Sequence, residues 1–264
     1  MIHQMVVALG RDSRGEGVAI DLVAPAHALL TGATRSGKTS LIYALISRAI
    51  QSSGDAQVAG CDVSSLLLHP LAGLPGEKLR ATGGGEFKSH MLAMSALVAE
   101  MDRRIDLLLE RQEDKYTEFD AELPLVLCVF DEFPSLVALA EADDAATARK
   151  AGERRGPILR RAFRRLVMEG AKVGFRVWVV ATRADASILG GAERSNCAVR
   201  ISLRADGPDA IRMLHPYATD IDAHTFPPGV GLIEEPSRGL RTAHFSSCSY
   251  ADYLAAIRVA IRKS

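Results

Sequence analysis

The sequence predicts an α/β protein with a mostly parallel central sheet and helices on both faces. Apolar clusters that are typical of buried strands alternate along the chain with segments of helical period. Several of these clusters are apolar continuously rather than alternately, as expected of strands that are covered on both faces. Strands that alternate with helices also imply right-handed crossovers and therefore an open sheet with parallel strands.

The individual elements follow from the same patterns. Strands are predicted at residues 4–9, 18–23, 27–31, 57–62, 123–130, 175–181, 198–203 and 229–233. Helices are predicted at residues 38–51, 88–114, 157–170 and 249–262. In the second helix, apolar residues from Met91 to Leu108 recur at spacings of three and four, so they share one face and fill the core.

The length of 264 residues allows one large domain or two small ones. We expect residues 25–264 to form this domain and residues 1–24 to add strands that pack on it. Residues 141–156, EADDAATARKAGERRG, are polar and almost free of large apolar side chains. They are expected to form an exposed insertion, either a loop or a marginal helix, because they bury too little surface to order themselves.

The charge balance excludes a global attraction to nucleic acid or membranes. The chain has 32 basic and 32 acidic residues, so any contact with a polyanion must come from a local cluster. One dense basic cluster runs from Arg149 to Arg165. On a helix, several of its members share a broad face that could pair with DNA, with an acidic neighbouring subunit or with water.

Cysteine usage and hydropathy predict a soluble cytoplasmic protein. The four cysteines are far apart and form no CxxC pair, so we expect neither a disulfide framework nor a zinc site. The first residues contain no apolar segment long enough for a signal peptide, and no run approaches the roughly 20 residues that span a bilayer.

The run GATRSGKTS at residues 32–40 fits the phosphate-binding pattern GxxxxGK[ST]. A strand precedes it and an amphipathic helix follows it, so its backbone N–H groups can curl around phosphate oxygens at the positive end of the helix. Lys38 is expected to reach the outer phosphates, and Thr39 to ligate Mg²⁺. The predicted nucleotide-binding residues are Gly32, Ala33, Thr34, Arg35, Ser36, Gly37, Lys38, Thr39 and Ser40.

Arg35 is the unusual residue of this run, because many related loops carry glycine at its position. The pattern leaves the side chain at this position free. We predict that Arg35 adopts a negative φ and points outward, toward the open side of the nucleotide or the next subunit, where it could lend positive charge.

Two carboxylates follow the predicted strand at 123–130. Asp131 and Glu132 therefore lie at the end of the sheet where α/β proteins bind ligands. Asp131 can hold Mg²⁺ opposite Thr39, while Glu132 can polarise the attacking water. A solvated acidic turn is the simpler alternative for this pair taken alone.

A further strand end supplies a cation. Thr182 and Arg183 follow the strand at 175–181, and Arg183 is placed to help neutralise charge on a γ-phosphate. The alternative is that Arg183 is an ordinary surface charge.

Together these stretches resemble the motor domain of the FtsK/SpoIIIE family of DNA-pumping ATPases, members of the additional-strand class of P-loop ATPases related to HerA. GATRSGKTSLI is similar to the family's Walker A stretch and LPLVLCVFDEFPSLVAL to its Walker B stretch. ALVAEMDRRIDLLLE looks like its long helix, and FPPGVGLIEE like its late glycine turn and closing strand. The resemblance covers residues 25–260 and implies a RecA-like P-loop NTPase fold.

The resemblance also implies a function. The family forms hexameric rings that hydrolyse ATP with Mg²⁺ at subunit interfaces and move double-stranded DNA through a central pore. Carried over to this chain, the catalytic residues are Lys38, Asp131, Glu132 and Arg183. The segments after the strand at 175–181 and around residues 204–212 match pore-facing loops, so Arg204 and Arg212 are candidate contacts to the DNA backbone, with plain solvated arginines as the alternative.

This chain departs from the family pattern at two positions. The family usually has glutamine where this chain has Arg183. The arginine that relatives send into the neighbouring site is Ala171 here, with Lys172 adjacent and Arg165 one to two helical turns earlier. The chain shows no membrane segment of its own, which leaves a separate membrane or replication partner open.

Two other functions remain open on the sequence alone. Related ring ATPases energise protein secretion, or serve conjugation or packaging complexes. A nucleotide-gated assembly module that binds ATP without translocating anything is a third possibility, and Glu132 argues against it because a mere binder does not need a catalytic carboxylate.

Overall fold

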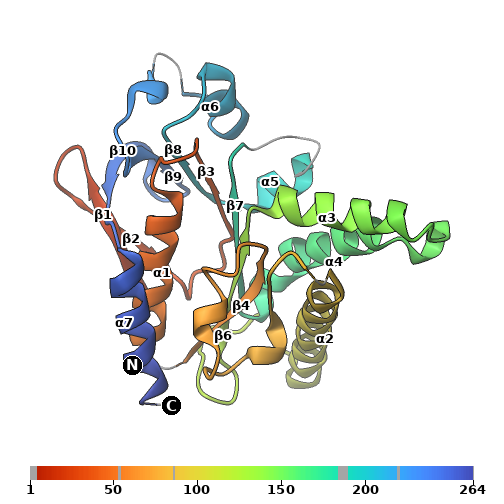
Figure 1. Ribbon diagram of the computed structural model, residues 1–264. Coiled ribbons are helices and arrows are strands. Elements are labelled where there is room, and N and C mark those ends of the chain that lie inside the picture. Colours follow the sequence, from red (N-terminus) through yellow and green to blue (C-terminus); the bar gives the residue numbers. More distant parts are fainter. Residues whose placement is uncertain (1–4, 53–54, 86, 184–189, 219–220, 264) are drawn as a thin grey trace.

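A single mixed sheet runs through the part of the chain that the computed structural model describes, which is residues 5–52, 55–85, 87–183, 190–218 and 221–263 (Figure 1). Its strands are β1 (Val6–Asp12), β2 (Gly17–Asp21), β3 (Ala28–Thr31), β4 (Ala56–Asp62), β5 (Arg80–Thr82), β6 (Leu125–Asp131), β7 (Phe175–Ala181), β8 (Val199–Leu203), β9 (Val230–Glu235) and β10 (Gly239–Phe245). Their order across the sheet is β2-β1-β10-β9-β8-β3-β7-β6-β4-β5.

The half of the sheet from β8 to β5 is parallel, as predicted. All residues of β3 and β7 are buried, and so are those of β6 except its last, Asp131. This accounts for the continuously apolar runs in the sequence, because helices cover these strands on both faces. β3 lies between β8 and β7, near the middle of the sheet.

The half from β2 to β9 is antiparallel, and β9 also pairs antiparallel with β8. The sequence prediction missed β10 here and β5 at the opposite edge. The strand predicted at 4–9 corresponds to β1, although residue 4 lies outside the described residues.

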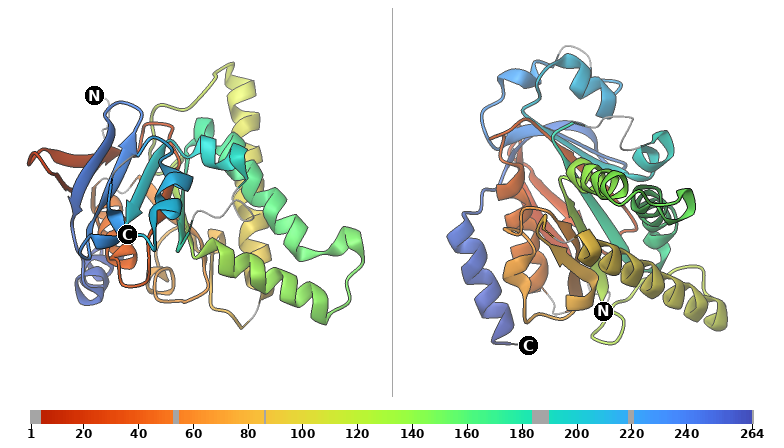
Figure 2. Two further views of the ribbon diagram at one scale, coloured as in Figure 1. Left: turned by 90° about the horizontal axis from the view of Figure 1, so that it is seen from above. Right: turned by 45° about the vertical axis from the view of Figure 1, so that its right-hand side comes forward.

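The helices cover both faces of the sheet. They are α1 (Lys38–Ser52), α2 (Phe87–Arg111), α3 (Phe133–Ala146), α4 (Arg155–Glu169), α5 (Gly191–Asn196), α6 (Pro208–Leu214) and α7 (Tyr250–Ile261), with 3-10 turns at His69–Leu71, Glu77–Leu79, Ala151–Glu153, Gly170–Val173 and Ala223–Thr225. Figures 1 and 2 show α1 and α7 together on one face and α2, α3 and α4 on the other. The four predicted helices are α1, α2, α4 and α7, whereas α3, α5 and α6 were not among them. Within the described ranges, no helix combines the length and apolar character that crossing a bilayer requires.

The polar stretch at 141–156 is ordered by charge pairing. Residues 141–146 continue α3, and the Asp144 carboxylate accepts hydrogen bonds from the N–H groups of Arg155 (2.7 Å) and Gly156 (2.9 Å) at the start of α4. Asp143 pairs with Arg149 at 3.2 Å and with Arg155 at 3.1 Å. Much of the basic cluster therefore meets carboxylates of its own chain.

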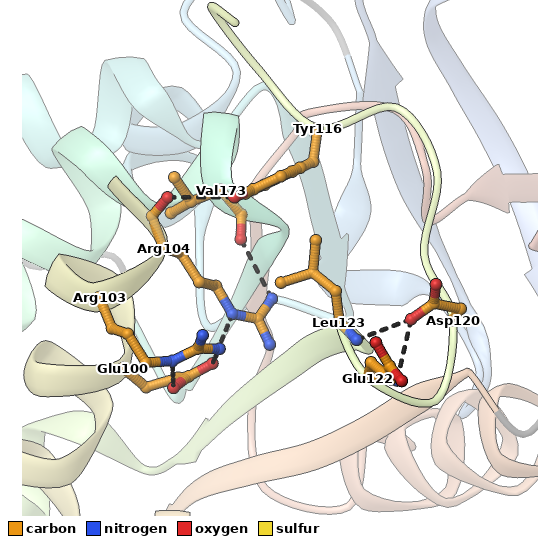
Figure 3. A network of polar contacts seen from close by, with 8 residues as sticks. All are labelled: Glu100, Arg103, Arg104, Tyr116, Asp120, Glu122, Leu123 and Val173. Carbon is orange, nitrogen blue, oxygen red and sulfur yellow. Dashed lines mark hydrogen bonds and ion pairs between the residues drawn. The ribbon is translucent and has the colours of Figure 1, made fainter. Parts of the chain in front are cut away.

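A buried arginine of α2 holds the turn that leads into β7 (Figure 3). Arg104 donates to the carboxylate of Glu100 at 2.7 Å and to the carbonyl of Val173 at 3.2 Å. Tyr116 donates back to the carbonyl of Arg104 at 3.3 Å. Residues 100–104 of α2 thus join the long helix to the central sheet.

A second buried arginine, Arg176 in β7, ties the same turn to the end of the N-terminal hairpin. Its guanidinium donates to four backbone carbonyls, those of Leu22 (2.6 Å), Val23 (2.7 Å), Ala171 (2.8 Å) and Phe175 (2.9 Å). Burial lowers the pKa of Arg176 to about 10, so it stays charged at neutral pH and needs all of these acceptors.

Candidate nucleotide-binding site

The predicted phosphate loop lies at the carboxyl edge of the parallel strands. Residues 32–37 connect the end of β3 to the start of α1. The parallel strands β4, β6, β7 and β8 end at the same edge, so residues far apart in sequence meet around this loop. This is the place at which open α/β sheets bind ligands.

The backbone of the loop presents free donors. The N–H groups of Gly37, Lys38 and Thr39 reach no backbone acceptor among the described residues, because they open the first turn of α1. Gly37 has φ +106°, and a Cβ there would lie 3.0 Å from the backbone nitrogen of Gly229. Glycine is therefore required at position 37 both by its conformation and by its neighbour.

The prediction for the backbone of Arg35 was wrong. Arg35 has φ +63°, in the left-handed region, rather than a negative φ. The reason is that successive right- and left-handed residues turn their N–H groups to one side, which is how a loop forms an anion-binding concavity. The side chain of Arg35 is exposed, in line with its predicted outward direction.

Lys38 lies at the centre of the site. Its ammonium group donates to the loop carbonyls of Gly32 and, at 3.2 Å, Ala33. Burial lowers the pKa of Lys38, and the negative charges of Glu132, Asp131 and Asp206 oppose this shift. These three carboxylates are therefore near enough to act on the Lys38 charge.

Asp131 ends β6 beside Asp62, which ends β4 in register with it. Burial and the charges of Asp62 and Glu132 raise the pKa of Asp131 to about 6, although Lys38 counteracts them. Asp62 is fully buried and accepts hydrogen bonds from the N–H groups of Leu67 (2.8 Å) and Leu68 (3.0 Å). The raised pKa of Asp131 reflects negative charge that Lys38 only partly offsets, and a cation bound there would lower it.

Glu132 is held by the neighbouring strand end. It has φ +49° and precedes α3, and its carboxylate accepts from the Thr182 hydroxyl at 3.2 and 3.3 Å. Arg183 follows Thr182, and its side chain is exposed at the same edge of the sheet. The chain thus brings Lys38, Asp131, Glu132 and Thr182 together at one edge, as the motifs predicted.

The chain after β8 braces the loop from two sides. The N–H of Ala33 donates to the carbonyl of Arg204 at 2.7 Å, and the Arg204 guanidinium donates to the carbonyl of Thr34 at 2.9 Å. The N–H of Gly229 donates to the carbonyl of Ser36 at 2.8 Å. Arg204, predicted as a DNA contact, is thus engaged by the phosphate loop.

A third brace comes from the segment before α7. The Ser40 hydroxyl donates to the carbonyl of Cys248 at 2.9 Å and accepts from its N–H at 2.8 Å. This pair fixes the first turn of α1 directly beside Thr39, whose side chain is exposed.

These groups fit a nucleoside triphosphate with Mg²⁺. Free amides and an ammonium group are donors for phosphate oxygens, while the Thr39 hydroxyl and the Asp131 carboxylate are hard oxygen ligands. Among the described residues no group of three or more His, Cys, Asp or Glu side chains could hold a metal by itself. A metal here would therefore share its ligands with phosphate and water, as Mg²⁺ does in nucleotide sites.

Other predicted residues lie apart from this site. Arg212 is on α6, 67% exposed, and pairs with Asp209 at 3.6 Å. Residues 184–189, in the segment after β7 matched to a pore-facing loop, lie outside the described residues. Arg165 is bound to Asp102 at 2.7 Å and also to Glu169, which commits its charge within the chain, whereas Lys172 is exposed.

Sequence reasoning missed Asp62, Arg204 as a brace, and the contacts of Ser40 and Gly229. A signal existed for Asp62, because the strand predicted at 57–62 ends on this carboxylate. No local pattern announces the other contacts, because each joins residues more than 160 positions apart.

Comparison with known proteins agrees with this site. The FtsK/SpoIIIE family profile matches residues 2–213. The DNA translocase FtsK of Listeria monocytogenes serovar 1/2a is 25% identical over 218 residues, and the match covers 76% of this chain and 26% of that protein. The protein of the same name from Staphylococcus aureus strain Mu50 is 23% identical over 216 residues, with 76% and 25% covered. The chain thus spans about a quarter of the length of these relatives.

Solved structures show the same RecA-like P-loop fold. The pCW3 conjugation coupling protein TcpA, solved as a monomer with ATPγS, superposes with a TM-score of 0.76 at 19% identity, covering 99% of this chain and 71% of that one. EssC (ATPases 2 and 3) from Geobacillus thermodenitrificans gives a TM-score of 0.73 at 14% identity, covering 100% and 49%. The cytoplasmic domain of the type VII secretion ATPase EccC from Thermomonospora curvata gives 0.70 at 18%, covering 98% and 31%.

Proposed function

Because this chain belongs to the FtsK/SpoIIIE family, we propose that it is an ATP-hydrolysing motor that moves double-stranded DNA through a ring of its own copies. The observation that carries the proposal is the convergence of the phosphate loop, Asp131 and Glu132 at one edge of the sheet, around the charge of Lys38. A nucleotide-gated switch that only binds ATP would not need Glu132 held in place by Thr182.

Each residue has a distinct role in the proposed hydrolysis. The free N–H groups of residues 37–39 and the Lys38 ammonium bind phosphate oxygens, and Lys38 leaves its loop carbonyls to do so. Thr39 and Asp131 would hold Mg²⁺, which would supply positive charge to the phosphate oxygens. Glu132, oriented by Thr182, accepts a hydrogen bond from the attacking water and turns it toward the γ-phosphate.

Two further residues complete the proposed site. Arg183 lies at the same edge and offers a cation to the γ-phosphate. Arg35 lies within the loop, and its exposed side chain faces outward, where a neighbouring copy or the nucleotide can meet it. Both are proposed as aids to the charge that develops in the transition state.

For the DNA, we propose that Arg212 on α6 contacts phosphates in the pore. Its side chain is exposed, and its pairing with Asp209, which is exposed even more, is loose. Arg204 has a smaller part in this contact, because its guanidinium is occupied by the carbonyl of Thr34.

The test is the ATPase rate with and without duplex DNA, measured together with the oligomeric mass in the presence of ATP. We expect duplex DNA to raise the rate at about 50 mM salt and to lose most of this effect by about 200 mM, because contacts to phosphates release counterions. Lys38→Ala and Glu132→Gln should each lower turnover by about 100-fold or more, with Glu132→Gln still binding ATP.

Matched variants separate DNA contact from general charge. Arg212→Ala should weaken stimulation by DNA, whereas Arg103→Ala, which removes an exposed arginine of α2, should not. ATP turnover that no DNA stimulates would instead favour a protein cargo. Full turnover in Lys38→Ala would overturn the site itself.

A further inference from the structure

A chain of buried hydrogen bonds lies directly behind the phosphate loop. The Thr31 and Ser202 hydroxyls are 3.1 Å apart, and Nε2 of His215 lies 3.1 Å from the same Ser202 oxygen. Nδ1 of His215 lies 2.9 Å from a carboxylate oxygen of Glu234. Thr31, Ser202 and His215 are all buried, and Glu234 at the far end is 27% exposed.

The partners of His215 determine which group donates in each of these hydrogen bonds. A carboxylate only accepts, so Nδ1 must carry the proton that it donates to Glu234. Nε2 of the neutral ring is then an acceptor and receives the Ser202 hydroxyl, which leaves Ser202 to accept from Thr31. Burial lowers the pKa of His215, although Glu234 opposes the shift, and this favours the neutral ring.

The order Ser, His, Glu is also that of a nucleophilic triad, but burial excludes this use. Ser202 is 1% exposed and lies within β8, between β3 and β9. No substrate carbonyl can reach its oxygen, so the chain of hydrogen bonds acts on the protein itself.

One end of this chain is the phosphate loop. Thr31 is the last residue of β3, and Gly32 follows it. Leu203, which follows Ser202, lies 3.0 Å from the position of a Cβ on Gly32. The hydroxyl of Ser202 therefore bonds to the residue from which the loop starts.

His215 also joins this chain of hydrogen bonds to the segment that carries α6. His215 directly follows α6, and its N–H donates to the carbonyl of Ile211 at 2.8 Å. Ile211 belongs to a small second core, separate from the main one, that also contains Ala205, Ala218 and Ala223. A displacement of α6 relative to β8 therefore acts on His215, and also on the hydrogen bond from the Arg200 guanidinium of β8 to the carbonyl of Leu214 at 3.3 Å.

We propose that His215 is a positioning residue for ATP hydrolysis: through Ser202 and Thr31 it sets the orientation of the phosphate loop according to the position of α6. The proposal rests on the nucleotide site proposed above. In the opposite direction, a shift of the loop on nucleotide binding is passed to His215 through the Thr31–Ser202 and Ser202–His215 bonds, and to α6 through the bond from the His215 N–H to Ile211.

The test removes one hydroxyl at a time. Thr31→Val keeps the shape of the side chain and loses the hydrogen bond, whereas Thr31→Ser keeps the hydroxyl. We expect kcat/KM for ATP to fall about fivefold in Thr31→Val and in Ser202→Ala, and Thr31→Ser to restore most of it. The double variant should lose little more than either single one, because the two share one chain of bonds.

A matched control separates positioning from stability. Ser47→Ala removes another buried serine hydroxyl, from the middle of α1, and should leave kcat/KM unchanged well below the unfolding temperature. If Ser202→Ala does not fold, Glu234→Gln offers the same test at the partly exposed end, since it keeps the volume but weakens the hold on the Nδ1 proton.

The outcomes are separable from those of the proposed function. Thr31→Val with the wild-type kcat/KM would overturn the positioning role even if Lys38→Ala is inactive. Loss of activity in Ser47→Ala equal to that in Ser202→Ala would show that any buried hydroxyl near α1 matters, and it would overturn the role as well.

Discussion

At the residue scale, the phosphate edge is built from unusual backbone. Arg35 (φ +63°) and Glu132 (φ +49°) both adopt the left-handed conformation without being glycine. Each such residue costs on the order of 1 kcal/mol and persists when its surroundings demand it. Arg35 adopts the positive φ because the loop N–H groups face inward. Glu132 adopts it because the chain changes direction sharply between β6 and α3.

Two substitutions at Arg35 separate its backbone from its charge. Arg35→Gly should unfold with a free energy about 1 kcal/mol higher than Arg35→Ala, because both lose the guanidinium but only glycine adopts a positive φ without strain. Urea unfolding of the two variants measures this difference. If the charge also serves ATP hydrolysis, both variants lose activity equally. An alanine variant as stable as the glycine one would contradict the strain.

At the element scale, the sequence predicted the parallel half of the sheet closely. β7 has the predicted bounds, and α1 ends one residue later than expected. α3 was missed because its apolar first half continues the β6 run and its polar second half resembles an insertion. β10 was missed because its residues mix polar and apolar side chains, and most of these side chains are only partly buried. Its pairing with β9, rather than its own sequence pattern, decides its conformation.

The candidate site likewise contains residues that the sequence predicts and residues that it does not. Residues fixed by short-range chemistry, such as Lys38 and Asp131, were predictable because a phosphate loop and a strand end each have a local signature. The braces at Arg204 and Ser40 were not, because hydrogen bonds to backbone carbonyls place no demand on local sequence. The positive φ of Arg35 was mispredicted because it follows from the inward turn of the loop N–H groups and not from the properties of its side chain.

The buried arginine that holds the turn before β7 should contribute strongly to stability. Arg176→Met should lower the free energy of unfolding by about 3–5 kcal/mol, because four backbone carbonyls lose their donor in a buried site. Arg103→Met, which removes an exposed arginine from its pair with Glu100 on α2, should cost less than about 1 kcal/mol. Urea unfolding compares the two, and equal costs would contradict the role of Arg176.

At the scale of the whole molecule, buried histidines make stability depend on pH. Burial lowers the pKa of His27 to about 4, assisted by the charge of Arg176, and also lowers the pKa of His90 and His215. The N–H of Val177 donates to Nδ1 of His27 at 2.9 Å, which requires an unprotonated nitrogen. The unfolded chain binds these protons more readily than the folded one.

Stability should therefore fall as the pH drops from about 6.5 toward 4, with His27 contributing up to about 3 kcal/mol. Asp131 acts in the opposite direction, because its raised pKa stabilises the fold as the pH falls through about 6. Urea midpoints between pH 7.5 and 4.5 measure the slope. His27→Asn, whose Oδ1 can accept from Val177, should flatten it, and an unchanged slope would contradict the assignment.

The path of the chain after β8 has a mechanical consequence. The chain leaves the sheet at Arg204, whose carbonyl is bonded to Ala33, and it returns at Gly229, whose N–H is bonded to Ser36. Both attachments are on the same short loop, three residues apart. A movement of the intervening segment would therefore shift the phosphate loop at two points. A displacement of α6 would therefore act on the phosphate loop through these two attachments as well as through His215.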